Sequence, residues 1–308
     1  MIKNKKLNIE ITGNGFPIVF IHSFLWDKTM WEPQIKELSS KYKCVNIDLY
    51  GHGKSDFLEK SNEYSLDQLT DDILDSLVDL NLKEYFYIGL SVGGMLAPYF
   101  YEKQKNKIKK MVIMDSYSGI ENETLKLKYF NMLDIILKEK KVSEYIIKEV
   151  VPMFFSYKTL DKQLDIVDNF KKSLREIKEE NIETIVTLGK AIFGRKNKLK
   201  DLKNIDIPVL FMVGEDDIPR PICESIEMNK IVKNSIYKKI PNSGHISNLE
   251  NPDFVTKEIE LFLIKWLKIA PFNFYFKGSY FLWFYHLYKK LFLQYFQLNY
   301  KFEKLHFL

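Results

Sequence analysis

The fold is decided by residues 85–94, which read Tyr85-Phe86-Tyr87-Ile88-Gly89-Leu90-Ser91-Val92-Gly93-Gly94. A buried-strand pattern runs directly into a glycine-rich turn, and a helical pattern follows. A sharp strand-to-helix turn needs glycines, because bulky side chains would collide with neighbouring strands. We expect this turn to hold Ser91 above the sheet, beside helix-start N–H groups that favour developing negative charge. An ordinary glycine-rich turn can have the same residues, so other motifs in the chain are needed to assign a catalytic role to Ser91.

Short apolar runs that alternate with helical patterns surround this stretch. Runs of about four β-branched or aromatic residues between turn residues are typical of buried parallel strands. Such runs lie at residues 18–21, 44–47, 85–88, 111–114, 209–213 and 235–237. The residues between them repeat apolar side chains at helical spacing, as in Leu69, Ile73 and Leu77. Strand and helix in alternation predict an α/β fold, a mostly parallel sheet with helices on both faces.

The strand pattern is interrupted in the middle of the chain. From residue 118 to 199 the sequence is rich in lysine and helical in pattern, with Pro152 as its main break. We therefore expect a core formed by residues 1–117 and 200–268, with an inserted helical cap at residues 118–199. Because such a cap would cover the opening above Ser91, we expect it to determine specificity.

Composition excludes several classes of protein. A chain of 308 residues that is 46% apolar can bury a sizeable core and is not intrinsically disordered. Cys44 and Cys223 provide neither a disulfide framework nor the paired spacing of a zinc site, which indicates a reducing, cytoplasmic location. The first residues lack the apolar core of a signal peptide. Arg175, Arg195 and Arg220 are the only arginines, so no nucleic-acid partner is expected.

A base and an acid are predicted at the same sheet edge as the serine. A serine hydroxyl becomes a good nucleophile when a histidine takes its proton and a carboxylate orients that histidine. Of the five histidines, His245 lies on the loop between the last predicted strand and the last helix. Asp216 and Asp217 follow the predicted strand that ends at residue 213. The carboxyl ends of these parallel strands should bring Ser91, His245 and one aspartate together.

In this order and context, the motifs resemble the α/β-hydrolase superfamily, specifically the cofactor-free serine hydrolases related to 3-oxoadipate enol-lactonases and carboxylesterases. The resemblance covers about residues 7–268. It implies the triad Ser91, Asp217 and His245, because the family's acid ends a Gly-x-x-Asp motif, with a proline, here Pro221, four residues later. Asp216 remains the alternative acid. A serine nucleophile also weighs against the dehalogenases and epoxide hydrolases, which use aspartate there.

The resemblance further implies an oxyanion hole formed by the backbone amides of Phe24 and Val92. The chain departs from the usual pattern at Ser23, where the family commonly has a glycine after the histidine. His22 is expected to hold this loop in place rather than to shuttle protons. His52 is expected to stabilise its own turn in the same way.

By resemblance, Ser91 attacks an ester-like carbonyl, His245 transfers the proton to the leaving group, and water cleaves the acyl-enzyme. No metal or organic cofactor is implied. The expected substrate is a small ester or enol-lactone. Two alternatives stay open, a noncatalytic protein that binds a small ligand in the cap cavity and a C–C bond hydrolase of the same family.

Aromatic residues and an arginine are expected to shape the substrate pocket. Trp26 lies beside the oxyanion loop, while Phe154 and Phe193 belong to apolar clusters of the cap, where they fit a pocket wall or the cap core equally well. Enol-lactonase-like enzymes act on carboxylated lactones, which an arginine can hold with two hydrogen bonds. Arg195 and Arg220 are the two candidates for that role.

The last forty residues, 269–308, have a different composition. Sixteen of them are aromatic, and five lysines against one glutamate give this segment a charge of +4. If it is helical, its polar residues form one narrow stripe, and its longest charge-free runs are too short to span a bilayer. Three interpretations remain, peripheral contact with a membrane surface, docking on the body or on a second subunit, and an extension without selected function.

Overall fold

A computed structural model describes residues 7–58, 64–162 and 165–267, with side chains up to Ile264. Seven strands form one sheet in the order β1-β3-β2-β4-β5-β6-β7. β1 is antiparallel to β3, and the remaining neighbours pair in parallel. The strands are β1 (Ile9–Thr12), β2 (Phe16–Ile21), β3 (Tyr42–Ile47), β4 (Tyr85–Leu90), β5 (Ile108–Met114), β6 (Val209–Gly214) and β7 (Ser235–Ile240). The predicted fold class is confirmed.

Burial explains why these segments form strands. All six residues of β4 and all six of β6 are buried, as expected for central strands covered on both faces. β4 continues for two residues beyond the predicted run, so Gly89 and Leu90 still belong to the strand. The turn that carries Ser91 is therefore shorter and tighter than the sequence pattern suggested.

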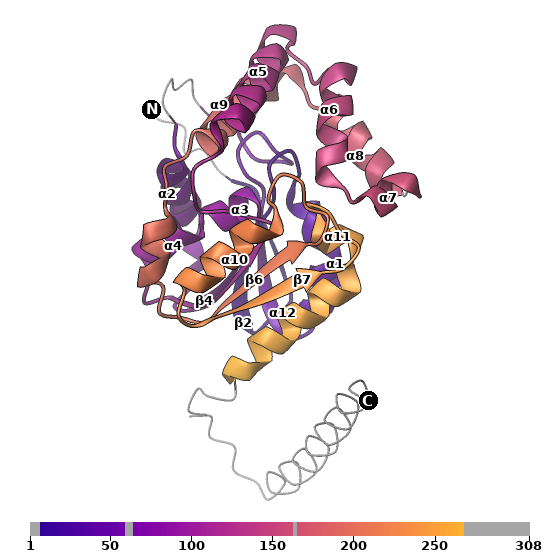
Figure 1. Cartoon of the computed structure of the whole chain (residues 1–308). Coiled ribbons are helices and arrows are strands. Elements are labelled where there is room, and N and C mark those ends of the chain that lie inside the picture. Colours follow the sequence, from indigo (N-terminus) through magenta and orange to yellow (C-terminus); the bar gives the residue numbers. More distant parts are fainter. Residues whose placement is uncertain (1–6, 59–63, 163–164, 268–308) are drawn as a thin grey trace, which may run out of the picture. The chain divides into compact units, whose positions relative to one another are not determined.

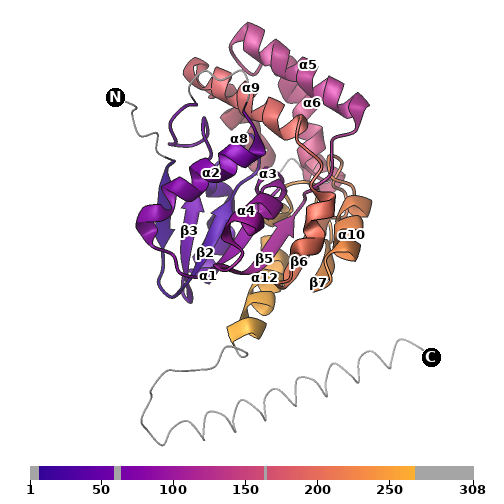
Figure 2. The same ribbon diagram turned by 90° about the vertical axis from the view of Figure 1, so that its left-hand side faces the viewer.

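Helices cover both faces of the sheet (Figures 1 and 2). One face carries α1 and α12, and the other carries α2, α4 and α10. The bounds of these and the short helices are η1 (Lys28–Trp31), α1 (Glu32–Leu38), α2 (Leu66–Ser76), η2 (Val78–Leu80), α3 (Val92–Met95), α4 (Ala97–Gln104), η3 (Leu199–Asn204), α10 (Ile222–Ile231), α11 (Ser247–Glu250) and α12 (Pro252–Leu267). This is the layered arrangement that alternating strands and helices predict.

A helical insert between β5 and β6 lies above the end of the sheet where α3 begins (Figure 1). Its helices are α5 (Glu123–Glu139), α6 (Glu144–Phe154), α7 (Tyr157–Asp161), α8 (Asp165–Arg175) and α9 (Glu179–Phe193). Each long helix is amphipathic. In α8, for example, Val167, Phe170 and Leu174 are buried at helical spacing. We refer to α5–α9 as the cap.

The expectations about membrane contact or self-association through residues 269–308 lie outside the described residues. Across residues 7–58, 64–162 and 165–267, no helix combines the length and the apolar character that a bilayer span requires.

Candidate active site

Ser91 occupies the turn between β4 and α3 in a backbone conformation that non-glycine residues rarely adopt, with φ 55° and ψ −114°. The glycines around it are required by space. A Cβ on Gly93 would lie 2.3 Å from the carbonyl oxygen of Ile21 on the neighbouring strand, and a Cβ on Gly89 would lie 2.3 Å from the backbone of Gly93. The sequence thus permits a turn that most sequences would exclude.

Hydrogen bonds hold this strained turn in place. The Ser91 N–H donates to Met114 O at 2.9 Å, which ties the turn to β5. The Ser116 hydroxyl donates to Ser91 O at 2.7 Å, and the Tyr87 hydroxyl donates to Gly93 O. Because both carbonyl groups of the turn are fixed, the direction of the Ser91 side chain is set by the backbone rather than by its own contacts.

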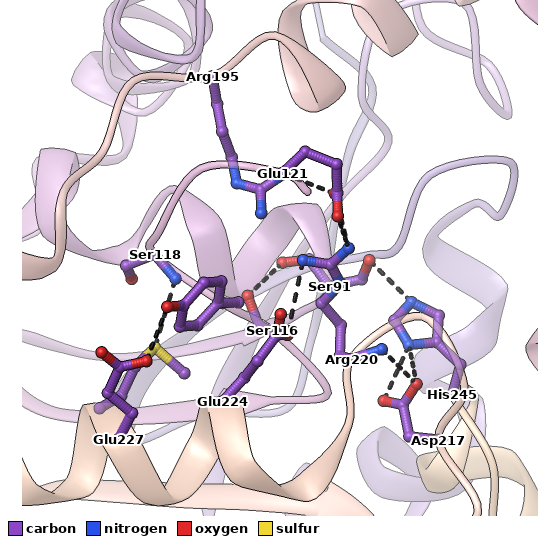
Figure 3. Close-up of polar contacts among 12 residues, drawn as sticks. Ser91, Ser116, Ser118, Glu121, Arg195, Asp217, Arg220, Glu224, Glu227 and His245 are labelled. Atoms are coloured by element: carbon purple, nitrogen blue, oxygen red, sulfur yellow. Dashed lines mark hydrogen bonds and ion pairs between the residues drawn. The ribbon is translucent and has the colours of Figure 1, made fainter. Parts of the chain in front are cut away.

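Ser91, His245 and Asp217 form a hydrogen-bonded chain (Figure 3). Ser91 Oγ lies 2.9 Å from His245 Nε2, and His245 Nδ1 lies 3.0 Å from each carboxylate oxygen of Asp217. All three residues are buried. A carboxylate at Nδ1 favours the proton on that nitrogen, which leaves Nε2 free to accept the serine proton. This geometry can activate Ser91 as a nucleophile.

The two candidate acids lie in different environments. Asp217 faces His245, and its Oδ1 also accepts a hydrogen bond from the Arg220 N–H at 2.9 Å. Asp216 is instead tied through its N–H to Ser243 O, and among the described residues its buried Oδ2 has no hydrogen-bond partner. The structure therefore brings Asp217, and not Asp216, to the histidine.

Asp115 is a buried carboxyl near the site that no sequence motif identified. Its Oδ1 accepts from the Gly214 N–H at 2.8 Å and its Oδ2 accepts from the Ser247 hydroxyl at 2.5 Å. It therefore connects the strand end before Asp217 with the segment after His245. Burial, together with the charge of Asp217, raises the pKa of Asp115 well above its usual value. Because Asp115 directly follows β5, at the same sheet edge as Ser91 and Asp217, its position in the sequence could have identified it.

Glu250 joins the histidine loop to the cap. One of its oxygens accepts from the Gly244 N–H at 2.7 Å, and the other accepts from the Ser156 N–H of the cap at 2.9 Å. The Ile246 N–H adds a bond to Phe154 O at 3.1 Å. Burial raises the pKa of Glu250. The loop that carries His245 is thus held from below by the sheet and from above by the cap.

Two neutral histidines hold the loop at residues 22–25. His22 Nε2 accepts from the Leu49 N–H at 2.8 Å, and His52 Nε2 accepts from the Leu25 N–H at 3.1 Å. Each Nδ1 faces a backbone carbonyl, so each ring carries its proton there. Burial lowers the pKa of both rings, that of His52 to about 3. Both histidines therefore act as uncharged acceptors at neutral pH.

The expected oxyanion donors are unpaired in the part of the chain that the structure describes. Neither the Phe24 nor the Val92 N–H donates a hydrogen bond there. Val92 begins α3, where the first N–H groups of a helix have no partner within the helix. Among the described residues, no protein group therefore competes for either N–H, as the oxyanion role would require.

A cavity of about 680 Å³, counting the part open to solvent, lies above Ser91 and His245. Phe24, Phe154 and Phe193 contribute to its lining. Trp26 lies elsewhere, because its ring stacks on Phe170 with centroids 4.6 Å apart, beside a separate hollow. Arg195 also lies outside this lining and pairs with a carboxylate described below.

The remaining lining residues come largely from the cap. One face of α5 contributes Tyr129, Met132, Leu133 and Ile136, at the three- and four-residue spacing of a helix. That spacing is visible in the sequence, but it is also the pattern of an ordinary core helix. Among the described residues, no group of three or more His, Cys, Asp or Glu side chains is placed to hold a metal ion.

Most of the chain is similar in sequence to proteins of known function. The chain is 26% identical over 266 residues to 3-oxoadipate enol-lactonase 1 of Acinetobacter baylyi, covering 84% of this chain and 92% of that protein. It is 23% identical over 296 residues to epoxide hydrolase 1 of Caenorhabditis elegans, covering 86% and 70%. Because these relatives are named for different reactions, the similarity does not define the substrate.

Solved structures show the same fold. An esterase from Thermogutta terrifontis superimposes with a TM-score of 0.76 at 24% identity, covering 84% of this chain and 93% of that one. The enol-lactonase from Burkholderia xenovorans gives 0.75 at 21% identity, with 85% and 98% covered. Residues 17–252 match the family profile described as alpha/beta hydrolase fold. This match spans well over half of the sequence and confirms the resemblance, so the chain belongs to the α/β-hydrolase family of hydrolases.

Proposed function

We propose that this protein is a serine hydrolase that cleaves a small ester or lactone through an acyl-enzyme on Ser91. The observation that carries the proposal is the chain of hydrogen bonds from Ser91 Oγ through His245 to Asp217 at the floor of an apolar cavity. A nucleophile, a base and an orienting carboxylate at these distances are the parts that acyl transfer requires.

In the first half-reaction, Ser91 Oγ forms a bond to the carbonyl carbon while its proton moves to His245 Nε2. The carbonyl oxygen becomes an oxyanion. This oxyanion accepts hydrogen bonds from the backbone N–H groups of Phe24 and Val92. The bond to the leaving oxygen then breaks, and His245 returns the proton to that oxygen. Asp217 stabilises the histidine while it is charged.

In the second half-reaction a water molecule replaces the alcohol. His245 takes one proton from the water as its oxygen attacks the acyl carbon. The bond to Ser91 Oγ then breaks, and His245 returns the proton to Ser91. The products are a carboxylic acid and a regenerated enzyme, so no oxidant or cofactor is consumed.

A fluorophosphonate reagent tests this proposal, because it forms a stable adduct with an activated serine. We expect mass spectrometry to locate the adduct on Ser91, with labelling at least 10³-fold slower in His245→Ala and absent in Ser91→Ala. Hydrolysis of p-nitrophenyl butyrate should fall in parallel. A folded protein that is neither labelled nor active on a panel of esters and lactones would favour a noncatalytic ligand-binding protein instead.

A further inference from the structure

The one arginine that lines the cavity above Ser91 already has an anionic partner (Figure 3). Arg220 Nη2 donates to both oxygens of Glu121 at 2.6 Å, and Arg195 Nη1 donates to the same carboxylate at 3.1 Å. All three residues are buried, and Glu121 is only 3% exposed. Glu121 thus takes the place that a substrate carboxylate would need in order to reach either arginine.

The charges of this cluster show that Glu121 is an effective partner. Burial alone would raise its pKa, but Arg220 and Arg195 lower it, so Glu121 is ionised at neutral pH. A second carboxyl, Glu224, lies 3.6 Å from Arg220 Nη1, and burial raises its pKa to about 7. Arg220 therefore has carboxyl groups beside both of its terminal nitrogens.

Several fully buried donor atoms of the cluster have no hydrogen bond. Within the described residues these are Arg220 Nη1 and the Nε and Nη2 atoms of Arg195, and all of them are buried. Arg195 does not line the cavity, and Arg220 Nη1 is directed at Glu224. A carboxylate bound above Ser91 would have to compete with Glu121 and Glu224 for Arg220.

The rest of the lining is apolar. Besides Arg220, the polar lining residues among those described are Ser91, Tyr129 and His245. The wall is otherwise built from aliphatic, aromatic and thioether side chains, such as Met95, Met132, Ile136, Ile146, Val150 and Met153. A carboxylate buried against such a wall loses its hydration without gaining a partner, whereas an alkyl or aryl group gains from leaving water.

We propose that the site accepts esters or lactones whose acyl group is uncharged and apolar, and that it discriminates against substrates with a carboxylate on that group. This inference rests on the proposed function and narrows it. It differs from the expectation that Arg195 or Arg220 would hold a carboxylated lactone, because both arginines already pair with Glu121 and Arg220 also lies beside Glu224.

Two esters of equal length test the inference, p-nitrophenyl hexanoate and mono-p-nitrophenyl adipate. They share a six-carbon acyl chain and a leaving group, and differ in one terminal carboxylate. At pH 8 we expect kcat/KM to be at least 100-fold higher for the hexanoate, after subtraction of spontaneous hydrolysis. Equal rates, or a preference for the adipate, would overturn the inference and leave the proposed function intact.

Glu121→Gln supplies an internal test, because it removes the carboxylate that Arg220 and Arg195 share. We expect the ratio of adipate to hexanoate turnover to rise at least tenfold. Glu227→Gln is the matched control, since Glu227 bonds the Tyr117 hydroxyl on a nearby exposed surface and touches neither arginine. An unchanged ratio in a folded Glu121→Gln protein contradicts the inference, and if that variant does not fold, the wild-type ratio decides.

Ser91→Ala separates the two proposals. Loss of turnover of both esters in this variant assigns the measured rates to the site above Ser91. If the wild-type protein is folded and hydrolyses neither ester, the proposed function fails and the inference fails with it.

Discussion

The carboxyl edge of the sheet and the cap enclose the same cavity by different means. At the sheet edge the backbone itself is constrained, since Leu25, Ser91 and Asp115 all have positive φ although none is a glycine. In the described part of the cap, Lys140 is the one such residue, and it simply ends α5. Strained backbone is maintained where reacting atoms must stay fixed, whereas a wall needs only shape and apolar surface. In the proposed function, the sheet edge would hold the reacting atoms and the cap would select the acyl group.

The largest effect is expected from the acid at the sheet edge. Asp217→Asn keeps the shape of the side chain but removes the charge that sets the tautomer of His245, so we expect kcat to fall about 10⁴-fold. Asp216→Asn, one residue away and not bonded to the histidine, should change kcat less than threefold. Steady-state hydrolysis of p-nitrophenyl butyrate by both variants measures the difference, and equal losses would show that the acid is not defined by this geometry.

Matched glycine substitutions compare the two regions directly. In Gly93→Ala the new methyl would lie 2.3 Å from Ile21 O, a backbone atom that cannot move away. We therefore expect the free energy of unfolding to fall by about 3 kcal/mol or more. In Gly189→Ala of the cap, the nearest atoms are the Leu133 methyls at 2.7 and 2.9 Å and the tip of Phe24 at 3.0 Å.

These side-chain ends can turn aside, and alanine favours a helix, so the Gly189→Ala change should stay within about 1.5 kcal/mol. Urea unfolding of both variants gives the two values. A smaller cost at Gly93 than at Gly189 would contradict the view that the sheet edge is the rigid region.

The difference between the constrained sheet edge and the cap also explains which parts of the site could be predicted from the sequence. The Ser91 turn was predictable because its backbone tolerates no Cβ at Gly89 and Gly93, and the sequence shows this requirement as glycines at both positions. His245 was predictable because parallel strands end at one edge. The cavity wall was not, since the apolar face of α5 has the pattern of any buried helix.

The ion pairs of the two buried arginines were less predictable still. Glu121 and Arg220 are 99 residues apart and meet only because the segment after β5 folds back over the loop after β6. Arg195 and Arg220 looked like free cations in the sequence, since nothing local identifies a partner at such a distance. Pairings between distant buried charges depend on the packed structure, which spacing along the chain does not encode.

The free energy of unfolding should depend on pH through His52, which lies in the loop after β3. The pKa of His52 is about 3 in the folded protein because the ring is buried, against about 6.5 in an unfolded chain. The unfolded state therefore binds the proton first, and the stabilisation is complete above pH 6.5 and is lost as the pH falls toward 3. Between pH 7 and pH 5 this loss amounts to about 2 kcal/mol.

His52→Gln tests this contribution, because glutamine does not titrate. We expect the variant to be less stable at pH 7 but to lose about 2 kcal/mol less than the wild type between pH 7 and pH 5, as measured by urea unfolding. The carboxyl groups titrate in both proteins and cancel in the comparison. The cap has no histidine between residues 118 and 199, so no corresponding change is expected from it. Parallel pH profiles for the two proteins would contradict the assignment.

The smallest effect is expected on the outer surface of the cap. Arg175 of α8 pairs with Glu144 of α6 through two hydrogen bonds, at 2.6 and 3.0 Å, but both side chains are exposed. Exposed ion pairs contribute little because water and salt screen them, so Arg175→Ala should change the free energy of unfolding by less than about 1 kcal/mol and kcat/KM by less than twofold. Hydrolysis of the hexanoate ester and urea unfolding check both values. A large loss of activity without a loss of stability would mean that the distance between α6 and α8 controls access to Ser91, and the cap would then take part in the reaction cycle rather than only shaping the cavity.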